Sequence, residues 1–161
     1  MTGFQKTINQ YPAPAVEGDF ASANPRASVL PSAEILVADT GGVTIGRFAW
    51  VDGTTVSNAT AGEGAPDGFI HRDHQALNYA LLSEATMVIP EGYAVTLHNA
   101  GDFWVKTLTN ATVGQKVFAS TTDGTVKTGA AGATVAGYVE TKWTVASAGA
   151  ANELIKITSW V

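Results

Sequence analysis

The sequence predicts a mainly β protein, in which a compact β-barrel, β-tulip-like or sandwich domain follows an extended N-terminal arm. Two observations support this prediction. Throughout residues 35–161, short apolar runs, several of them alternating with polar residues, end at Gly, Asp or Pro turn signals. Residues 1–34, by contrast, hold four of the six prolines and show no sustained periodicity. At most one or two short helices are expected.

The arm is predicted to span residues 1–34 and the β domain residues 35–161. Because the residue before a proline favours extended backbone, the arm should run without a sheet of its own. It nevertheless carries many apolar side chains, which are costly to leave in water. We therefore expect it to dock on another protein surface through Phe4, Ile8, Tyr11, Pro12, Pro14, Val16, Phe20, Pro25 and Arg26. A loose tail, or an arm folded back on its own domain, is the alternative interpretation.

The first half of the β domain is expected to contain two hairpins. Residues 35–38 and 43–51 are apolar runs separated by a Gly-rich turn, which predicts the first hairpin, and residues 52–68 are predicted to be a loop. Residues 73–87 have the only helix-friendly composition, which allows one short helix. The second hairpin is expected over residues 93–107, with its turn near the middle.

The second half has more closely spaced turn signals, so the domain is divided into two candidate subregions, 35–110 and 111–161. An Asp-Gly pair within residues 117–127 predicts a tight hairpin. Residues 135–139 and 154–161 supply further strands, and in the last of these Ile and polar residues alternate between the two faces. Closing these strands into a barrel would remove exposed edges.

Composition excludes several classes of partner and site. The chain of 161 residues has no cysteine, which removes disulfides, thiolate nucleophiles and Cys-based zinc sites. Its net charge is −5 and its lysines stand singly, so nucleic acid and anionic membranes are not expected partners. No apolar run approaches the roughly 20 residues that span a bilayer, and the start lacks a signal-peptide pattern. Charged residues make up only 14%, against about 25% on average, which favours a surface partly covered by partner proteins.

No motif indicates catalysis, and we expect no enzyme activity, cofactor or metal. His71 and His74 have the look of a ligand pair, but zinc usually needs three or four ligands and only His98 remains. Asp102 precedes two aromatic residues and is interpreted as a turn residue. The serines lack an activating G-x-S-x-G frame, and no glycine cluster forms a phosphate-binding loop.

Several segments resemble the structural cement proteins of tailed bacteriophages. The most specific is the N-terminal stretch GFQKTINQYPAPAVEGDFASANPR at residues 3–26. Residues 43–52, 68–72, 83–92 and 101–105 resemble internal blocks of the same family, whereas residues 111–161 are only generically similar to small β domains of phage heads.

The resemblance implies a virion structural protein on the outer surface of the capsid, made in the host cytoplasm. It would bind the major capsid protein, often as a homotrimer at three-fold and quasi-three-fold positions, and cement neighbouring subunits against DNA pressure. The alternatives are a phage tail, baseplate or fibre module and a carbohydrate-binding β domain, in which the four tryptophans would stack on sugars. An esterase or glycosidase is the weakest alternative, because no nucleophile frame is present.

Overall fold

The computed structural model describes residues 15–31, 35–60, 62, 64–73, 81–82, 84 and 86–160. Every regular element among these residues is a β-strand, which confirms the prediction of a mainly β protein. The segment in which a helix was allowed, residues 73–87, lies largely outside the described part of the chain. The described residues contain no helix that could cross a membrane.

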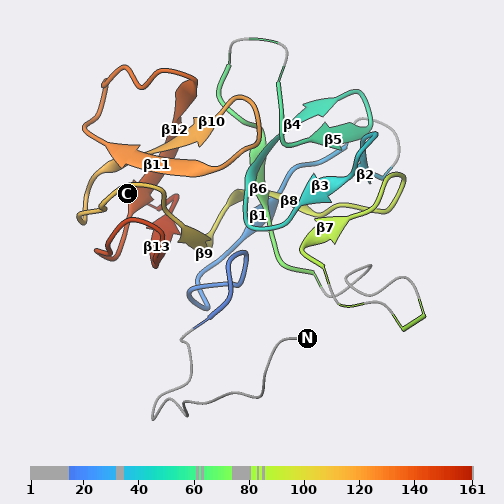
Figure 1. The fold of residues 1–161 in the computed structure, drawn as a ribbon, viewed down its shortest axis with the longest axis horizontal. Coiled ribbons are helices and arrows are strands. Elements are labelled where there is room, and N and C mark those ends of the chain that lie inside the picture. The colour runs from blue at the N-terminus through green and yellow to red at the C-terminus, as the bar shows by residue number, and fades with distance from the viewer. Residues whose placement is uncertain are drawn as a thin grey trace.

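The C-terminal part of the chain forms a five-stranded antiparallel sheet (Figure 1). Its order is β11 (Val126–Gly129), β10 (Lys116–Ser120), β12 (Tyr138–Val145), β13 (Leu154–Thr158) and β9 (Asp102–Lys106). The predicted tight hairpin is confirmed, because β10 pairs with β11 across the Asp-Gly turn. The predicted last strand is also confirmed: Ile155 and Ile157 are fully buried, while Leu154 and Lys156 on the other face are partly exposed.

The remaining strands are shorter and come from distant parts of the sequence. The six-stranded sheet has the order β1 (Ala27–Ser28), β8 (Leu97–Ala100), β6 (Gly68–Ile70), β4 (Phe48–Asp52), β5 (Thr55–Ser57) and β2 (Val37–Ala38). A separate two-stranded sheet joins β3 (Val43–Thr44) and β7 (Val88–Ile89). The described sheets do not close into a barrel, so the sandwich is the predicted architecture that fits.

The predicted first hairpin, between residues 35–38 and 43–51, is wrong. Strand β2 pairs in parallel with β5, and β3 pairs with β7 instead. Gly46, whose φ is 75°, interrupts the second apolar run and separates β3 from β4. The hairpin forms one turn later, where Gly53 and Thr54 connect β4 to β5, so the segment predicted as a loop contains a strand.

The second predicted hairpin, over residues 93–107, is also wrong. Strand β8 pairs with β1 and β6, while β9 pairs with β13 in the other sheet. Gly101, between β8 and β9, is therefore a crossing between sheets and not a hairpin turn. Its N–H donates to Oγ of Ser159 at 2.8 Å, and the N–H of Ser159 donates to its carbonyl oxygen at 3.1 Å.

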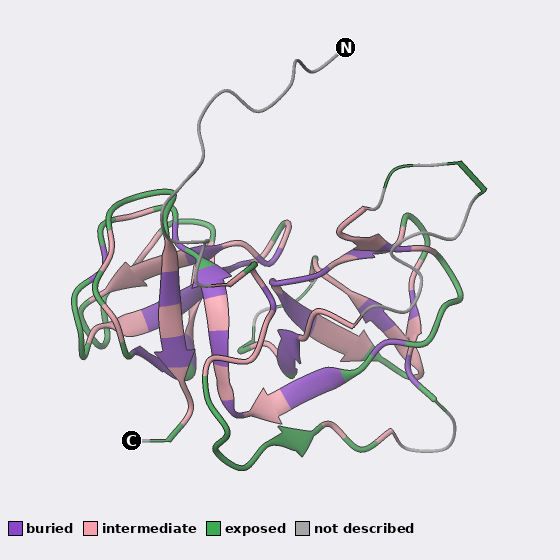
Figure 2. Cartoon of the chain, turned by 90° about the horizontal axis from the view of Figure 1, so that it is seen from below, coloured by how far each residue is buried: buried purple, intermediate pink, exposed green. Residues whose placement is uncertain are grey.

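Strands β4 and β6 separate two hydrophobic cores. Phe48 and Phe69 point into the core shared with the five-stranded sheet, which also contains Trp143. Their neighbours Ala49 and Ile70 point into a second core, closed from the other side by β2, β3 and β7. Because successive residues of a strand face opposite ways, two short apolar strands line both cores. Buried residues lie along strands in both halves of the molecule, and exposed residues lie mainly in the connecting loops (Figure 2).

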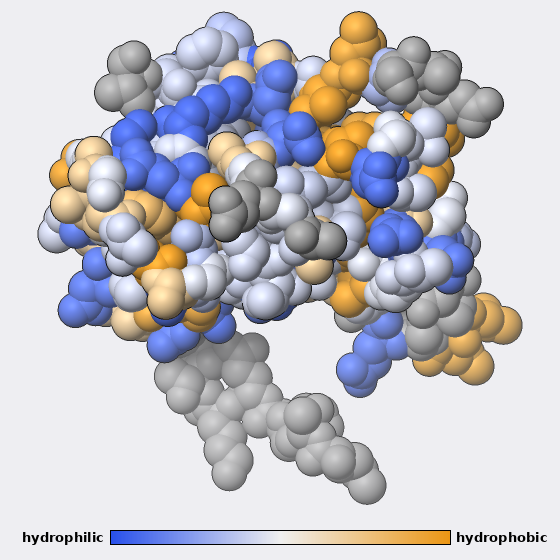
Figure 3. Space-filling model, turned by 90° about the horizontal axis from the view of Figure 1, so that it is seen from above, coloured by the Kyte–Doolittle hydropathy of each residue, from blue (hydrophilic) through white to orange (hydrophobic). Residues whose placement is uncertain are grey.

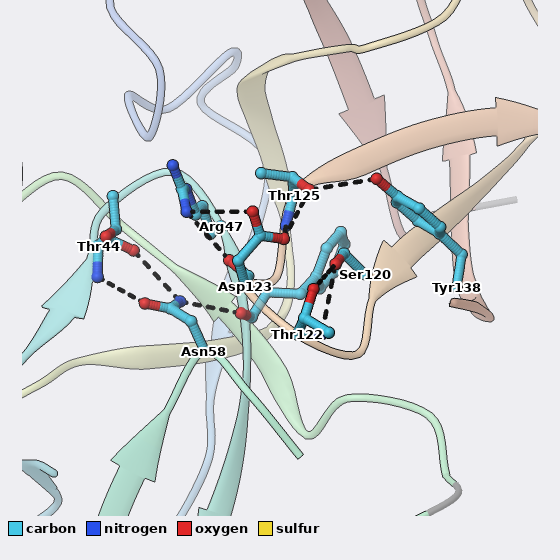
Figure 4. Close-up of polar contacts among 9 residues, drawn as sticks. Thr44, Arg47, Asn58, Ser120, Thr122, Asp123, Thr125 and Tyr138 are labelled. Carbon is cyan, nitrogen blue, oxygen red and sulfur yellow. Dashed lines mark hydrogen bonds and ion pairs between the residues drawn. The ribbon is translucent and has the colours of Figure 1, made fainter. Parts of the chain in front are cut away.

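The turn between β10 and β11 joins the two sheets (Figure 4). The N–H of Phe48 donates to the carbonyl oxygen of Gly124 at 3.0 Å. The guanidinium of Arg47 lies 3.2 Å from the carbonyl oxygen and 3.6 Å from the carboxylate of Asp123, and Thr125 donates two hydrogen bonds to the same carboxylate. Gly124 has a φ of 68°, and a Cβ there would collide with the carbonyl oxygen of Phe48. The joint therefore requires glycine at this position.

Candidate functional site

The described part of the N-terminal arm runs along an edge of the five-stranded sheet. The N–H of Gly18 donates to the carbonyl oxygen of Trp104 at 2.8 Å, and the N–H of Trp104 donates to that of Asp19 at 2.9 Å. The N–H of Ala21 adds a third bond to Asp102, also at 2.9 Å. Residues 18–21 therefore occupy the edge of β9 that no named strand covers. An exposed edge would invite unwanted pairing, and this segment closes it.

Two contacts with Arg72 hold the same segment from the side of the six-stranded sheet. The N–H of Arg72 donates to the carbonyl oxygen of Gly18 at 2.9 Å, and its guanidinium pairs with the carboxylate of Asp19 at 3.2 Å. Gly18 is buried with a φ of 91°, and a Cβ there would lie 2.7 Å from a methyl carbon of Ile45. Only glycine allows the chain to come this close.

Phe20 is the central side chain of this contact. Its ring stacks on His71, with centroids 3.8 Å apart and an interplanar angle of 15°. The guanidinium carbon of Arg26 also lies 3.8 Å from the centroid, and two groups so close cannot share one face, so the ring is sandwiched between them. Phe103 and His98 contact it from the core side, with centroids 5.3 and 5.6 Å away. This combines a cation–π contact with aromatic packing.

Asp102 fastens the chain that follows Phe20. The hydroxyl of Ser22 and the side-chain amide of Asn24 each donate to Oδ2 of Asp102 at 2.6 Å. Burial alone would raise the pKa of Asp102, but hydrogen bonds from Ser22, Thr158 and Asn24 outweigh it and hold the pKa below its ordinary value. The carboxylate therefore stays ionised, and the polar contact is kept at neutral pH.

The segment then crosses to the other sheet as β1. Ser28 pairs with His98 of β8, and the N–H of Val29 donates to the carbonyl oxygen of Leu97 at 2.8 Å. His98 is only 7% exposed. Burial, followed by the nearby charges of His71 and Arg26, lowers the pKa of His98 from 6.5 to about 4. His98 is neutral at physiological pH, which suits its place beside Phe20.

The structure places the predicted docking residues in different surroundings. Val16, Pro25 and Arg26 are exposed, whereas Phe20 faces its own domain. The predicted residues Phe4, Ile8, Tyr11, Pro12 and Pro14 lie outside the described part of the chain. The division into an arm and a β domain at residue 34 stays a prediction, and so does the contact of the arm with a partner.

Sequence reasoning did not find the residues that receive the arm. In the sequence, His71 is part of a weak metal-ligand pair with His74, and Asp102 is interpreted as a turn residue before two aromatic residues; neither pattern indicates a contact with the arm. The one signal that pointed to them was the resemblance of residues 68–72 and 101–105 to phage blocks. Among the described residues, no group of three or more acidic or histidine side chains could hold a metal ion. The residues that receive the arm can hold this segment of the chain against the domain.

Comparison with known proteins identifies the family. The sequence model of the XM1 gp53 minor capsid protein matches residues 4–159. A search of curated proteins finds no match. Among solved structures, a chain from the capsid of Myoviridae phage XM1 is similar over 98% of both chains, with a TM-score of 0.65 and 17% sequence identity, which shows a shared fold.

The family match spans the docked segment as well as both sheets, and it confirms the resemblance to phage head proteins. Such a protein is a structural part of the virion and associates with the capsid. The chain belongs to the XM1 gp53 minor capsid protein family.

Proposed function

We propose that this capsid protein cements the phage head. It binds the outer surface of the capsid and joins neighbouring major capsid protein subunits, so that the pressure of packaged DNA does not separate them. It acts by binding alone and catalyses no reaction. The observation that carries the proposal is the root of the N-terminal segment, which is fastened to both sheets through residues 18–29.

A segment that joins two capsid subunits must stay attached to its own domain under tension. Tension on residues 1–14 would reach the domain through the main-chain hydrogen bonds between residues 18–21 and β9. The ion pair of Asp19 with Arg72 and the packing of Phe20 act on the same stretch. Because these contacts bear the load together, pulling one residue free requires several bonds to break at once. The root is thus suited to transmit force.

Residues 1–14, which precede the root, would supply the contacts with the neighbouring subunit. Phe4, Ile8 and Tyr11 are the large apolar side chains of residues 1–14, apart from Met1. Each contributes up to about 1.5–3 kcal/mol if it becomes fully buried on a neighbouring subunit, before the cost of ordering the segment is subtracted. Repetition of such contacts over the shell multiplies their effect. The body of the protein would rest on one subunit while its arm holds the next.

Association of the protein into homotrimers at three-fold positions would place three arms around one axis. The low fraction of charged residues favours such covered surfaces. Sedimentation of the purified protein tests it, and a monomer both free and on the capsid would contradict it. The alternative of a tail or baseplate module has no support in the family match.

The test compares heads that carry the intact protein with heads that carry Phe4→Ala/Ile8→Ala/Tyr11→Ala. We expect the variant to fold, because none of these residues belongs to the described sheets. It should leave the capsid under milder salt stress and at a lower temperature than the intact protein does. DNA release from full-length genomes is followed on heating. Val113→Ala, at a residue that is 66% exposed in a turn far along the sequence, is the matched control and should behave as the intact protein.

Equal release temperatures for heads with and without the protein would contradict cementing. Loss of stability in heads without the protein, but no difference between the triple variant and the intact protein, would contradict the role of the arm. Immunogold labelling of intact, DNA-filled heads tests the outer location independently. Label only on broken heads would place the protein inside.

A further inference from the structure

A groove on the face opposite the second core is unrelated to the docked arm. It runs along the β4–β5 hairpin and has a volume of about 480 Å³. Its lining includes Asp39, Trp50, Asp52, Thr55 and Ser57. A second groove of about 560 Å³ meets it at the loop between β5 and β6 and extends to Tyr138 in β12. The middle of the face seen in Figure 3, which looks down on this loop, is mostly pale, as weakly polar residues are.

Strand alternation explains why these side chains gather on one face. Trp50 stands opposite Ser57, and Asp52 stands opposite Thr55, in the antiparallel register of the hairpin. Directly opposed residues, and residues two apart on one strand, share a face of the sheet. Asp39 follows β2, which pairs with β5, and its N–H donates to a carbonyl oxygen of β5 at 3.0 Å. The result is one aromatic ring among two carboxylates and two hydroxyls.

The Trp50 ring is held as a fixed platform. Its indole N–H donates to the carbonyl oxygen of Gly64 at 3.1 Å, and it packs against the first hydrophobic core. The side chain is half-buried, so part of the ring still lines the groove. A ring that is already ordered loses little conformational entropy when a ligand stacks on it. It resembles in this respect the rigid aromatic anchors of binding surfaces.

The charge of the groove decides which ligand fits. Asp39 and Asp52 form no ion pair with any described residue, and no described residue lining either groove is Lys or Arg. Anionic ligands such as phosphates or acidic sugars would be repelled. A neutral sugar has an apolar ring face for the indole and several hydroxyls that donate to carboxylates. Hydrogen bonds to charged acceptors are the stronger ones, which suits a shallow, wet site.

We propose that this groove binds a neutral oligosaccharide, with one sugar ring on Trp50 and hydroxyl groups donating to Asp39 and Asp52. The second groove, which reaches Tyr138, provides room for further sugar units of the same chain. One site should bind with a dissociation constant on the order of 0.1–1 mM, because it is open to solvent. Many copies on one shell would raise the avidity for a polysaccharide surface. The proposal goes beyond cementing and does not depend on it.

The test titrates the full-length protein with neutral oligosaccharides of glucose, galactose, mannose and N-acetylglucosamine, a sialylated glycan and a Lys-rich peptide. Calorimetry gives the affinity, and amide chemical shifts give the location. We expect a neutral glycan to bind, with the largest shifts in β4 and β5. Trp50→Ala should weaken binding at least tenfold, whereas Trp160→Ala, at a tryptophan 48% exposed near the C-terminus, should change it less than twofold (order-of-magnitude expectations for one stacking contact).

Trp50→Phe and Asp52→Asn keep the test decisive if Trp50→Ala fails to fold. The Phe variant keeps an aromatic ring but loses the bond to Gly64, and the Asn variant keeps size but loses charge, so each should weaken binding by about three- to tenfold. Equal affinity of Trp50→Ala and Trp160→Ala, or no binding of any neutral glycan, overturns the proposal. Binding of only the Lys-rich peptide, abolished by salt, would overturn it in favour of a basic protein partner. None of these outcomes bears on head stability.

Discussion

The two large sheets of this protein are assembled in different ways. The five-stranded sheet comes from residues 102–158 alone, and its strands are four to eight residues long. The six-stranded sheet draws two- to five-residue strands from between residues 27 and 100, and only β4 and β5 are neighbours both in the sheet and along the chain. Two of the four pairings in the first sheet, β10–β11 and β12–β13, join strands that follow each other along the chain. The second is held by contacts between distant segments, which require packing to form before they gain stability.

The joint between the sheets offers the strongest way to break this arrangement. Gly124→Ala forces a side chain against the carbonyl oxygen of Phe48 at a positive φ, and we expect it to lower the free energy of unfolding by about 3 kcal/mol. Gly132→Ala is the matched control. Gly132 has a similar φ of 74° but open space around it, so only backbone strain of about 1 kcal/mol should appear. Urea unfolding measures both, and equal losses would show that the joint is not tight.

The chemistry of local turns explains which hairpins could be predicted from the sequence. The turn containing Asp123 and Gly124 predicts the β10–β11 hairpin, because apolar runs flank it on both sides. A similar signal at Asp52 and Gly53 predicts only the end of a strand, since nothing in the sequence marks Thr55–Ser57 as its partner. At Gly101 the turn signal predicts a hairpin, whereas the chain changes sheet there, and only the distant partner strands reveal the change.

The candidate site also depends on contacts between distant segments, which local patterns do not reveal. Phe20 stood out as an apolar residue in a Pro-rich segment, but the histidine that stacks on it belongs to a different part of the sequence. Periodicity cannot report a contact between the edge of β9 and residues 18–21, because the arm has no strand pattern of its own. The segments that resemble phage cement proteins, residues 68–72 and 101–105, include the residues that receive the arm, but they do not indicate that these residues contact it.

The docking of the arm is tested by Phe20→Ala. We expect the free energy of unfolding to fall by about 2 kcal/mol, because a half-buried ring loses its contacts with His71, Phe103 and Arg26. Amide hydrogen exchange should accelerate for residues 18–21 and for Trp104, whose N–H bonds to the arm. Val16→Ala, at an exposed residue of the same segment, should change stability by less than about 0.5 kcal/mol. Unchanged exchange in the Phe20 variant would show that hydrogen bonding alone holds the arm.

The pH dependence of stability should reveal His98. Its pKa is about 4 in the folded protein and 6.5 when free, so the unfolded state binds more protons between these values. Stability from this group is therefore complete above pH 6.5 and falls as the pH drops toward 4, by roughly 1–2 kcal/mol after allowing for screening. His98→Gln should flatten that part of the profile. A profile from pH 6.5 to 4 that is the same in both proteins would contradict the assignment.

The smallest expected effect concerns the ion pair at the joint. The side chains of Arg47 and Asp123 are 34% and 46% exposed, and exposed pairs contribute less than about 1 kcal/mol. Burial would raise the pKa of Asp123, but hydrogen bonds from Ser120 and Thr125, together with the charge of Arg47, lower it, so the carboxylate keeps partners when the arginine is removed. Arg47→Gln should therefore cost about 0.5 kcal/mol at low salt.

The salt dependence of that small loss separates charge from geometry at the joint. At high ionic strength the loss of stability from Arg47→Gln should shrink, because salt screens the exposed ion pair and weakens it already in the intact protein. The loss from Gly124→Ala should not change, since it arises from a collision with Phe48 that salt does not affect. Urea unfolding of both variants at low and high salt provides the measurement. If the Arg47 loss instead persists in high salt, the hydrogen bond from its guanidinium to the carbonyl oxygen of Asp123, 3.2 Å long, is what joins the sheets there.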